Sequence, residues 1–187
     1  MKKVFLILFI CYSSFGFCQT NNNVKSFEFE LFIGPIYANN YNNSEFTDIG
    51  KTYGLEGRYN LSQTPYSIGL KAQIAGFNRK YDIRNWENIG NLKIGLTFDY
   101  NFRHWKHISL FTGAGLGISL LYVDRHSISS SIYSILPREK TALCINPRLG
   151  AEFFKRIRLT ADINIIDAEH SFIGVNLGFV LGGGNRK

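Results

Sequence analysis

Apolar and polar residues alternate along most of the chain after residue 26. Eight segments show this alternation with a period of two, at 27–34, 53–61, 66–75, 91–102, 108–122, 143–153, 157–165 and 173–181. A period of two is typical of β-strands, because successive side chains of a strand point to opposite faces. The segments are about ten residues long, which is the length of a tilted membrane-spanning strand. Strands of soluble proteins are usually about five or six residues long.

The connections between these segments alternate in length. Residues 62–65, 103–107 and 154–156 are short connections, whereas 38–51, 76–90 and 123–141 are long, and the last connection, 166–171, is shorter. Short periplasmic turns and longer external loops are typical of outer-membrane barrels. We therefore predict an all-β fold, a closed antiparallel eight-stranded up-and-down transmembrane β-barrel with its N-terminus in the periplasm. Pro147 falls inside the sixth segment, where we expect a bulge or a missing ladder bond.

The polar set of the alternation indicates which face points inward. It contains six acidic and five basic residues: Glu28, Glu30, Glu56, Asp99, Glu152 and Asp162, with Arg58, Lys71, Lys93, Arg148 and Arg158. Five basic residues facing lipid would cost roughly 10–20 kcal/mol, as much as the whole stability of about 5–15 kcal/mol of a typical domain. We therefore predict that the apolar set faces lipid and that the polar set faces the lumen.

The lumen of an eight-stranded barrel is only wide enough to be filled by side chains. The eleven charged residues are therefore interpreted as a packed ion-pair network. A narrow or gated ion path is the functional alternative for the same residues.

The first eighteen residues have the layout of a secretory signal peptide. Lys2 and Lys3 precede an apolar run over 4–10, and the small residues Gly16 and Cys18 precede Gln19. We predict cleavage near Cys18–Gln19, which divides the chain into a signal peptide, 1–18, and a barrel domain, 19–187. A lipidated Cys18 is the rival interpretation, disfavoured by the bulky Phe17 before it. Cleavage lowers the formal net charge from +7 to +5 and leaves Cys144 as the sole cysteine, so no intramolecular disulfide can form.

Composition excludes several other classes of protein. Of the 187 residues, 15% are aromatic and 19% are charged, which argues against a disordered chain and against a helical bundle. No long cluster of Lys and Arg supports nucleic-acid binding. The four histidines and the cysteine show no metal-ligand spacing, and we expect no metal and no cofactor.

The predicted loops contain residue types that could carry chemistry or recognition. Ser, His and carboxylate residues, the parts of a hydrolase triad, occur in two groups: Asp124, His126, Ser127, Ser129, Ser130, Ser131 and Glu139, and Asp167, Glu169, His170 and Ser171. Their spacing matches no motif, so a solvated polar loop is favoured. Candidates for contact with a surface partner are Tyr41, Tyr81, Trp86 and His126.

The leader, the alternating segments and the closing strand SFIGVNLGFVLGG together make the mature chain resemble the small eight-stranded outer-membrane barrels, namely the OmpA-like transmembrane domain and OmpX-type proteins. Barrels of this group often end on an aromatic residue, whereas here Phe179 is the last aromatic residue and eight residues follow it. The resemblance implies an outer-membrane location, surrounding lipid and lipopolysaccharide, and a monomer.

We expect a structural or surface-interaction role through the loops 38–51, 76–90 and 123–141, without nucleic acid. A lipid-A-modifying hydrolase and an exported soluble, lipocalin-like ligand-binding barrel are the alternatives. Some barrels of the group that the chain resembles act on the acyl chains of lipid A, which is why the hydrolase is kept among them.

Overall fold

The computed structural model describes residues 26–38, 46–47, 49–61, 64–82, 85–102, 107–127, 135–167 and 169–182. Within these ranges the chain forms β-strands and no helix: β1 (Phe27–Ala38), β2 (Phe46–Thr47), β3 (Gly50–Asn60), β4 (Tyr66–Asp82), β5 (Asn85–Phe102), β6 (Ile108–Ser127), β7 (Ile135–Phe153), β8 (Ile157–Asn164) and β9 (Phe172–Leu181). The predicted signal peptide and Tyr41 lie outside the described residues.

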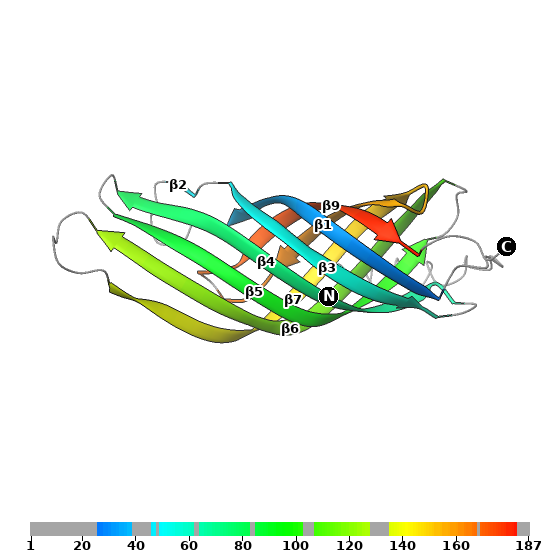
Figure 1. The fold of residues 1–187 in the computed structure, drawn as a ribbon, viewed down its shortest axis with the longest axis horizontal. Helices are drawn as coiled ribbons and strands as arrows, with labels where there is room; N and C mark the ends of the chain where they lie inside the picture. The colour runs from blue at the N-terminus through cyan, green and yellow to red at the C-terminus, as the bar shows by residue number, and fades with distance from the viewer. Residues whose placement is uncertain are drawn as a thin grey trace, which may run out of the picture.

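Eight of these strands close into a barrel in which every pairing is antiparallel. Each long strand pairs with its neighbours in the sequence, β4 pairs with β5, and β1 pairs with β9 to close the ring (Figure 1). The two-residue strand β2 adds to the edge of β4. The predicted closed, antiparallel, up-and-down barrel of eight strands is therefore confirmed.

Two ends of the barrel can be distinguished by their connections. The turn end carries the connections 61–65, 103–107 and 154–156, and the loop end carries 39–49, 83–84, 128–134 and 165–171. At the loop end, β4 to β7 reach much further than the other strands, as the ribbon shows (Figure 1). These four strands have 17, 18, 20 and 19 residues, whereas β8 has 8 and β9 has 10.

The prediction of long loops over 76–90 and 123–141 is therefore wrong for most of their length. Residues 76–82 and 85–90 pair with each other as a hairpin, with Lys80 opposite Trp86 and Asp82 opposite Asn85. Residues 123–127 continue β6, residues 135–141 begin β7, and Gly50 and Lys51 already belong to β3. We call residues 77–82, 85–89, 123–127 and 135–141 the projecting sheet.

Over most of the barrel the apolar residues face outward and the polar residues face the lumen. The solvent-exposed fraction is 63% for Leu96 and 57% for Leu70, whereas it is 4% for Lys93, which lies on the opposite face of the same strand as Leu96. The same alternation runs along the whole of β9, where Ile173, Val175 and Leu177 are exposed. This polarity is the reverse of that of a soluble domain, in which apolar side chains are buried.

The polarity inverts where the projecting sheet begins. Phe77 and Ile89 point inward and are buried, and they pack with Ile36 and Phe172 in an apolar cluster at the loop end. Their neighbours Asn78 and Asn88 are exposed on the outer face. Further along the hairpin, Arg79 and Glu87 point inward and Trp86 lies on the outer face, so neither face stays apolar. The sequence pattern predicts loops there because the regular alternation of apolar and polar residues ends.

Pro147 interrupts the pairing of β7 with β8 without a shift of register. The ladder covers Arg148 to Phe153, and the isolated bridge of Ile145 with Ile165 keeps the same register. In this register Pro147 stands opposite Ile163 and has no N–H to donate. The side-chain amide of Asn146 donates instead to the carbonyl oxygen of Ile163, at 3.1 Å. The expected irregularity is thus a missing ladder bond rather than a bulge.

Candidate functional site: the charged lumen

Arg148, on β7, lies in the charged lumen and connects β3, on the opposite side of the ring, with β5, the next strand but one. Its guanidinium donates two hydrogen bonds of 2.6 Å to the carboxylate of Glu56, one of 2.8 Å to Asp99 Oδ1 and one of 2.7 Å to Asp99 Oδ2. All three residues are buried. The planar guanidinium suits this arrangement, because its five N–H donors form a rigid fork that matches carboxylates.

A second group of charges fills the lumen toward the turn end. Arg58 donates to Glu30 and, at 3.3 Å, to Glu28. Arg158 donates to Asp99 at 2.7 Å and lies 3.8 Å from Glu30.

Arg158 makes two further contacts in this group. The guanidinium of Arg158 lies 3.7 Å from Glu152 and stacks 3.5 Å above the ring of Phe111, a cation–π contact. Arg158 on β8 thereby contacts residues of four other strands, β1, β5, β6 and β7.

Toward the loop end the network contains more ammonium groups than carboxylates. Lys71 donates to Asp162 at 2.8 Å. Lys93 donates to the side-chain oxygen of Asn164, whose amide donates in turn to Asp162 at 3.3 Å. Asn164 therefore connects the second lysine to the same carboxylate, so that two lysine side chains share one aspartate.

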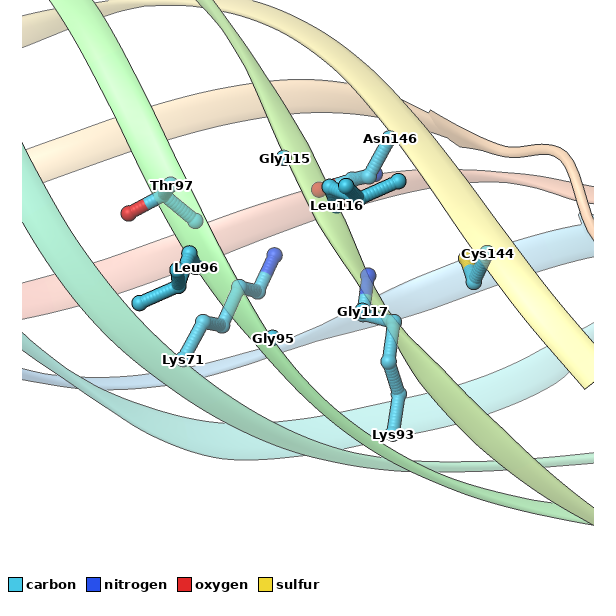
Figure 2. A pocket seen from close by; sticks show the side chains of 10 residues that line it. All are labelled: Lys71, Lys93, Gly95, Leu96, Thr97, Gly115, Leu116, Gly117, Cys144 and Asn146. Carbon is cyan, nitrogen blue, oxygen red and sulfur yellow. The ribbon is translucent and has the colours of Figure 1, made fainter.

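A small cavity lies beside these two lysines. Figure 2 shows the side chains of Lys71 and Lys93 rising beside the glycines of β5 and β6, with Cys144 and Asn146 on β7. The cavity has a volume of about 10 Å³, which is near the lower limit for one water molecule. The lumen is therefore filled by side chains here, and its lining is mostly polar and charged, whereas a lipocalin-like barrel requires an apolar lumen.

Glycines on the lumen face make room for the network. A Cβ atom at Gly113 would lie 2.1 Å from Asp99 Oδ1 and 2.4 Å from the carbonyl oxygen of Phe98. A Cβ atom at Gly178 would lie 2.1 Å from Glu30 Oε1. Because these distances are far below van der Waals contact, a side chain at either position would displace a carboxylate of the network.

The sequence reasoning missed two charged residues that point into the barrel. Arg79 and Glu87 are buried and stand opposite each other in the β4–β5 register. Arg79 also donates to the main-chain carbonyl oxygen of Glu169, in the connection between β8 and β9. Both residues fall in the stretch that the sequence pattern predicts as a loop. The signal available in the sequence was the pair of opposite charges on either side of a tight turn.

The connection between β8 and β9 is folded around the carboxylate of Asp167. Lys140 donates to it at 2.8 Å, the main-chain N–H groups of Glu169 and His170 donate at 3.0 and 2.7 Å, and Nδ1 of His170 lies 2.8 Å away. Partial burial favours the neutral acid, but the hydrogen bonds from Lys140 and His170 outweigh it and lower the pKa of Asp167 to about 2.

The second group of hydrolase-type residues does not assemble a triad from Asp167, His170 and Ser171. The hydroxyl of Ser171 donates to the main-chain carbonyl oxygen of Asp167 and accepts from the N–H of Ile166. It is therefore directed at the backbone of its own connection, whereas a triad serine bonds to the histidine.

The candidates for surface contact are placed in different parts of the chain. Trp86 lies on β5 in the projecting sheet, partly exposed. Tyr81 and His126 belong to β4 and β6, and their side chains lie outside the described set. Among the described residues there is no cluster of three potential metal ligands. The described part of the chain contains no apolar helix of membrane-spanning length.

The closed ring of eight antiparallel strands, with charged residues inside and apolar residues outside, is the fold of the small outer-membrane barrels. Neisserial surface protein A has this fold, with a TM-score of 0.58 and 12% identity over 85% of this chain and 98% of that one. Ail, the attachment invasion locus protein of Yersinia pestis, has a TM-score of 0.50 and 12% identity over 86% of this chain and 99% of its own. The N-terminal barrel domain of Pseudomonas aeruginosa OprF has a TM-score of 0.47 and 16% identity over 86% of this chain and 98% of its own.

These likenesses concern the fold, because the identities are low. No family model and no curated protein matches the chain. The fold that the resemblance implied is confirmed.

Proposed function

We propose that this chain is an integral outer-membrane β-barrel with a non-enzymatic, structural or surface-interaction role, exported by a signal peptide that is cleaved near Cys18–Gln19. The observation that carries the proposal is the reversed polarity of the barrel. Lipid is the solvent in which a wall of exposed leucine and isoleucine side chains around a charged interior is the stable arrangement.

The height of the outward apolar surface supports a membrane-spanning role. On β1 the outward side chains from Phe27 to Tyr37 are apolar or aromatic. These ten steps of about 3.3 Å span about 33 Å along the strand, and a tilt of about 40° reduces this to about 25 Å, the height of the apolar band of outer-membrane barrels.

Aromatic residues at both limits of this surface support the same proposal. At the turn end, Tyr66, Phe98, Tyr100 and Phe102 form a chain of ring contacts, with centroids between 4.7 and 5.4 Å apart. Toward the loop end, Tyr37, Tyr53 and Tyr122 are exposed on the outside. Amphipathic rings at both membrane interfaces are typical of such barrels.

The polarity inversion supports a loop end that stands outside the membrane. Asn78 and Asn88 replace apolar residues on the outer face directly beyond the row formed by Gly76, Gly90 and Tyr122. A sheet that leaves lipid and enters water must exchange its outward apolar residues for polar ones. The projecting sheet is then the part of the barrel that is available for contact at the cell surface.

Gel mobility of the outer-membrane fraction tests this proposal. A folded barrel of the mature chain should migrate differently before and after boiling, and the band should co-purify with outer membranes. A chain that lacks residues 1–18 should not reach that fraction. Recovery of the mature protein in the soluble periplasmic fraction, with one mobility at both temperatures, would overturn the proposal.

A further inference from the structure

The outer face of the projecting sheet combines aromatic and amide side chains in a regular array. The β4–β5–β6 register places Gly76, Gly90 and Tyr122 in one row, and Asn78, Asn88 and Asp124 in the next. Lys80 and Trp86 stand side by side in the row after that. The side chains of Asn78, Asn88 and Lys80 are exposed, and those of Trp86 and Asp124 are partly exposed.

We propose that this face binds the oligosaccharide headgroup of the glycolipid that surrounds the barrel in the outer leaflet. Trp86 is the platform on which a sugar ring stacks, and Asn78, Asn88 and Asp124 are the groups that hydrogen-bond to its hydroxyls. The inference deepens the proposed membrane function and rests on it.

The chemistry of these residues matches that of a sugar. One face of a pyranose ring consists of C–H groups, which pack on the flat apolar surface of an indole. Sugar hydroxyls both donate and accept, and an asparagine side chain offers two donors and an acceptor at one position. The glycines add a flat approach, because a Cβ atom at Gly76 would have no atom closer than 3.9 Å and one at Gly90 none closer than 3.8 Å.

The position of the face selects a membrane-linked sugar over a soluble one. The face continues the lipid-facing surface of β4, β5 and β6 on the same side of the sheet, so it points sideways into the surrounding leaflet. Trp86 lies four residues beyond the row of Tyr122, because it pairs with position 126 on β6. Four steps correspond to about 13 Å along the strand, or about 10 Å above the interface after tilting, where the headgroup sugars of a glycolipid lie.

Fluorescence of Trp86 tests the proposal in the intact barrel. The chain has two tryptophans, so a Trp105→Phe variant of the mature protein leaves Trp86 as the only one. We would refold it into phosphatidylcholine vesicles that contain either lipopolysaccharide with its core sugars, lipid A alone, or neither. The expected result is that acrylamide quenching of Trp86 falls at least about twofold with the core sugars and is unchanged with lipid A alone.

Substitutions test whether the proposed residues cause this protection of Trp86 from acrylamide. The double variant Asn78→Ala, Asn88→Ala should require about ten times more lipopolysaccharide for the same protection of Trp86 from acrylamide. This is the equivalent of about 1.4 kcal/mol. Thr141→Ala is the matched control, since Thr141 is an exposed polar residue on the outside of β7, and it should leave the protection unchanged. Heat-modifiable mobility shows that each variant is folded.

The outcomes separate this proposal from the proposed function. Equal protection by lipid A alone, unchanged protection in the asparagine variant, or equal protection by free core oligosaccharide at the same sugar concentration would each overturn the inference while the barrel still inserts. Failure of the folded protein to insert into any of the vesicles would overturn the membrane function itself.

Discussion

Replacing Arg148 by glutamine is expected to destabilise the barrel far more than the loss of an exposed cation. The change removes four hydrogen bonds, of 2.6 to 2.8 Å, from the carboxylates of Glu56 and Asp99. Both carboxylates remain buried. Removal of one partner from a buried ion pair costs about 3–5 kcal/mol, because the charge that remains has lost its compensation.

The loss can be measured as the urea midpoint of unfolding of the refolded barrel. With a slope of about 2 kcal/mol per molar urea, the midpoint should fall by about 1.5–2.5 M. Lys51→Gln is the matched control, because Lys51 is an exposed cation of the barrel wall. Its loss should change the free energy of unfolding by less than about 1 kcal/mol.

A double-variant cycle shows whether the loss comes from the pair itself. Glu56→Gln neutralises one of the two carboxylates that Arg148 contacts, so the combined variant should be less destabilised than the sum of the two single variants. The coupling energy is expected to be about 1–3 kcal/mol. If Arg148→Gln shifts the midpoint no more than Lys51→Gln does, the ion pairs do not stabilise the fold, and the interpretation of the lumen as a packed network is wrong.

Further predictions follow from other contacts. Leu96→Arg places a cation on the lipid-facing side and should cost about 2–4 kcal/mol in a bilayer, while Leu96→Ala should cost much less; equal stability of both in vesicles would contradict the assigned polarity. Gly178→Ala should displace Glu30 from Arg58 and destabilise the barrel by about 1–3 kcal/mol, measurable in the same urea titration. The Asp167 pKa of about 2 lies below its ordinary value of 3.8, so the stability that this carboxylate contributes is present above about pH 4 and is lost as the pH falls toward 2. Amide NMR signals of Glu169 and His170 should titrate with a midpoint near pH 2. A midpoint near 4 would refute the hydrogen bond of Lys140 to Asp167. Refolded protein in planar bilayers should show no stable large channel, because the lumen is filled; frequent large openings would contradict this.

The alternation of the sequence was sufficient to predict the barrel, its strand number and the direction of its charged face. Segments such as 91–102 have a strict period of two, and the energetic penalty for basic residues in lipid leaves one orientation for them. The pairing of particular charges was not predictable, since the contact of Arg148 with Glu56 joins positions on opposite sides of the ring whose distance depends on strand tilt and stagger.

The extensions of β4 to β7 were missed for a different reason. Around Phe77 and Ile89 the apolar residues point inward and the asparagines point outward, so the pattern that identifies a lipid-facing strand is inverted. Beyond these residues Arg79 and Glu87 point inward and Trp86 lies on the outer face, so apolar and polar residues occur on both faces and the period of two is lost.

The compensation at Pro147 was also beyond the reach of sequence reasoning. The replacement of its missing N–H depends on the amide of Asn146 reaching the carbonyl oxygen of Ile163. Nothing in the local sequence distinguishes this solution from a bulge, because both relieve the same missing donor.

The central claim is that lipid surrounds the apolar face of the barrel and that the charged residues are enclosed. Spin labels at single cysteines test it most directly, in a chain of residues 19–187 with Cys144→Ser, which removes the only cysteine of that segment. With labels at positions 70, 96 and 116 of the protein refolded in vesicles, collisions with oxygen, which dissolves in acyl chains, should far exceed collisions with a water-soluble nickel chelate. A greater accessibility of these labels to the nickel chelate than to oxygen would contradict the account.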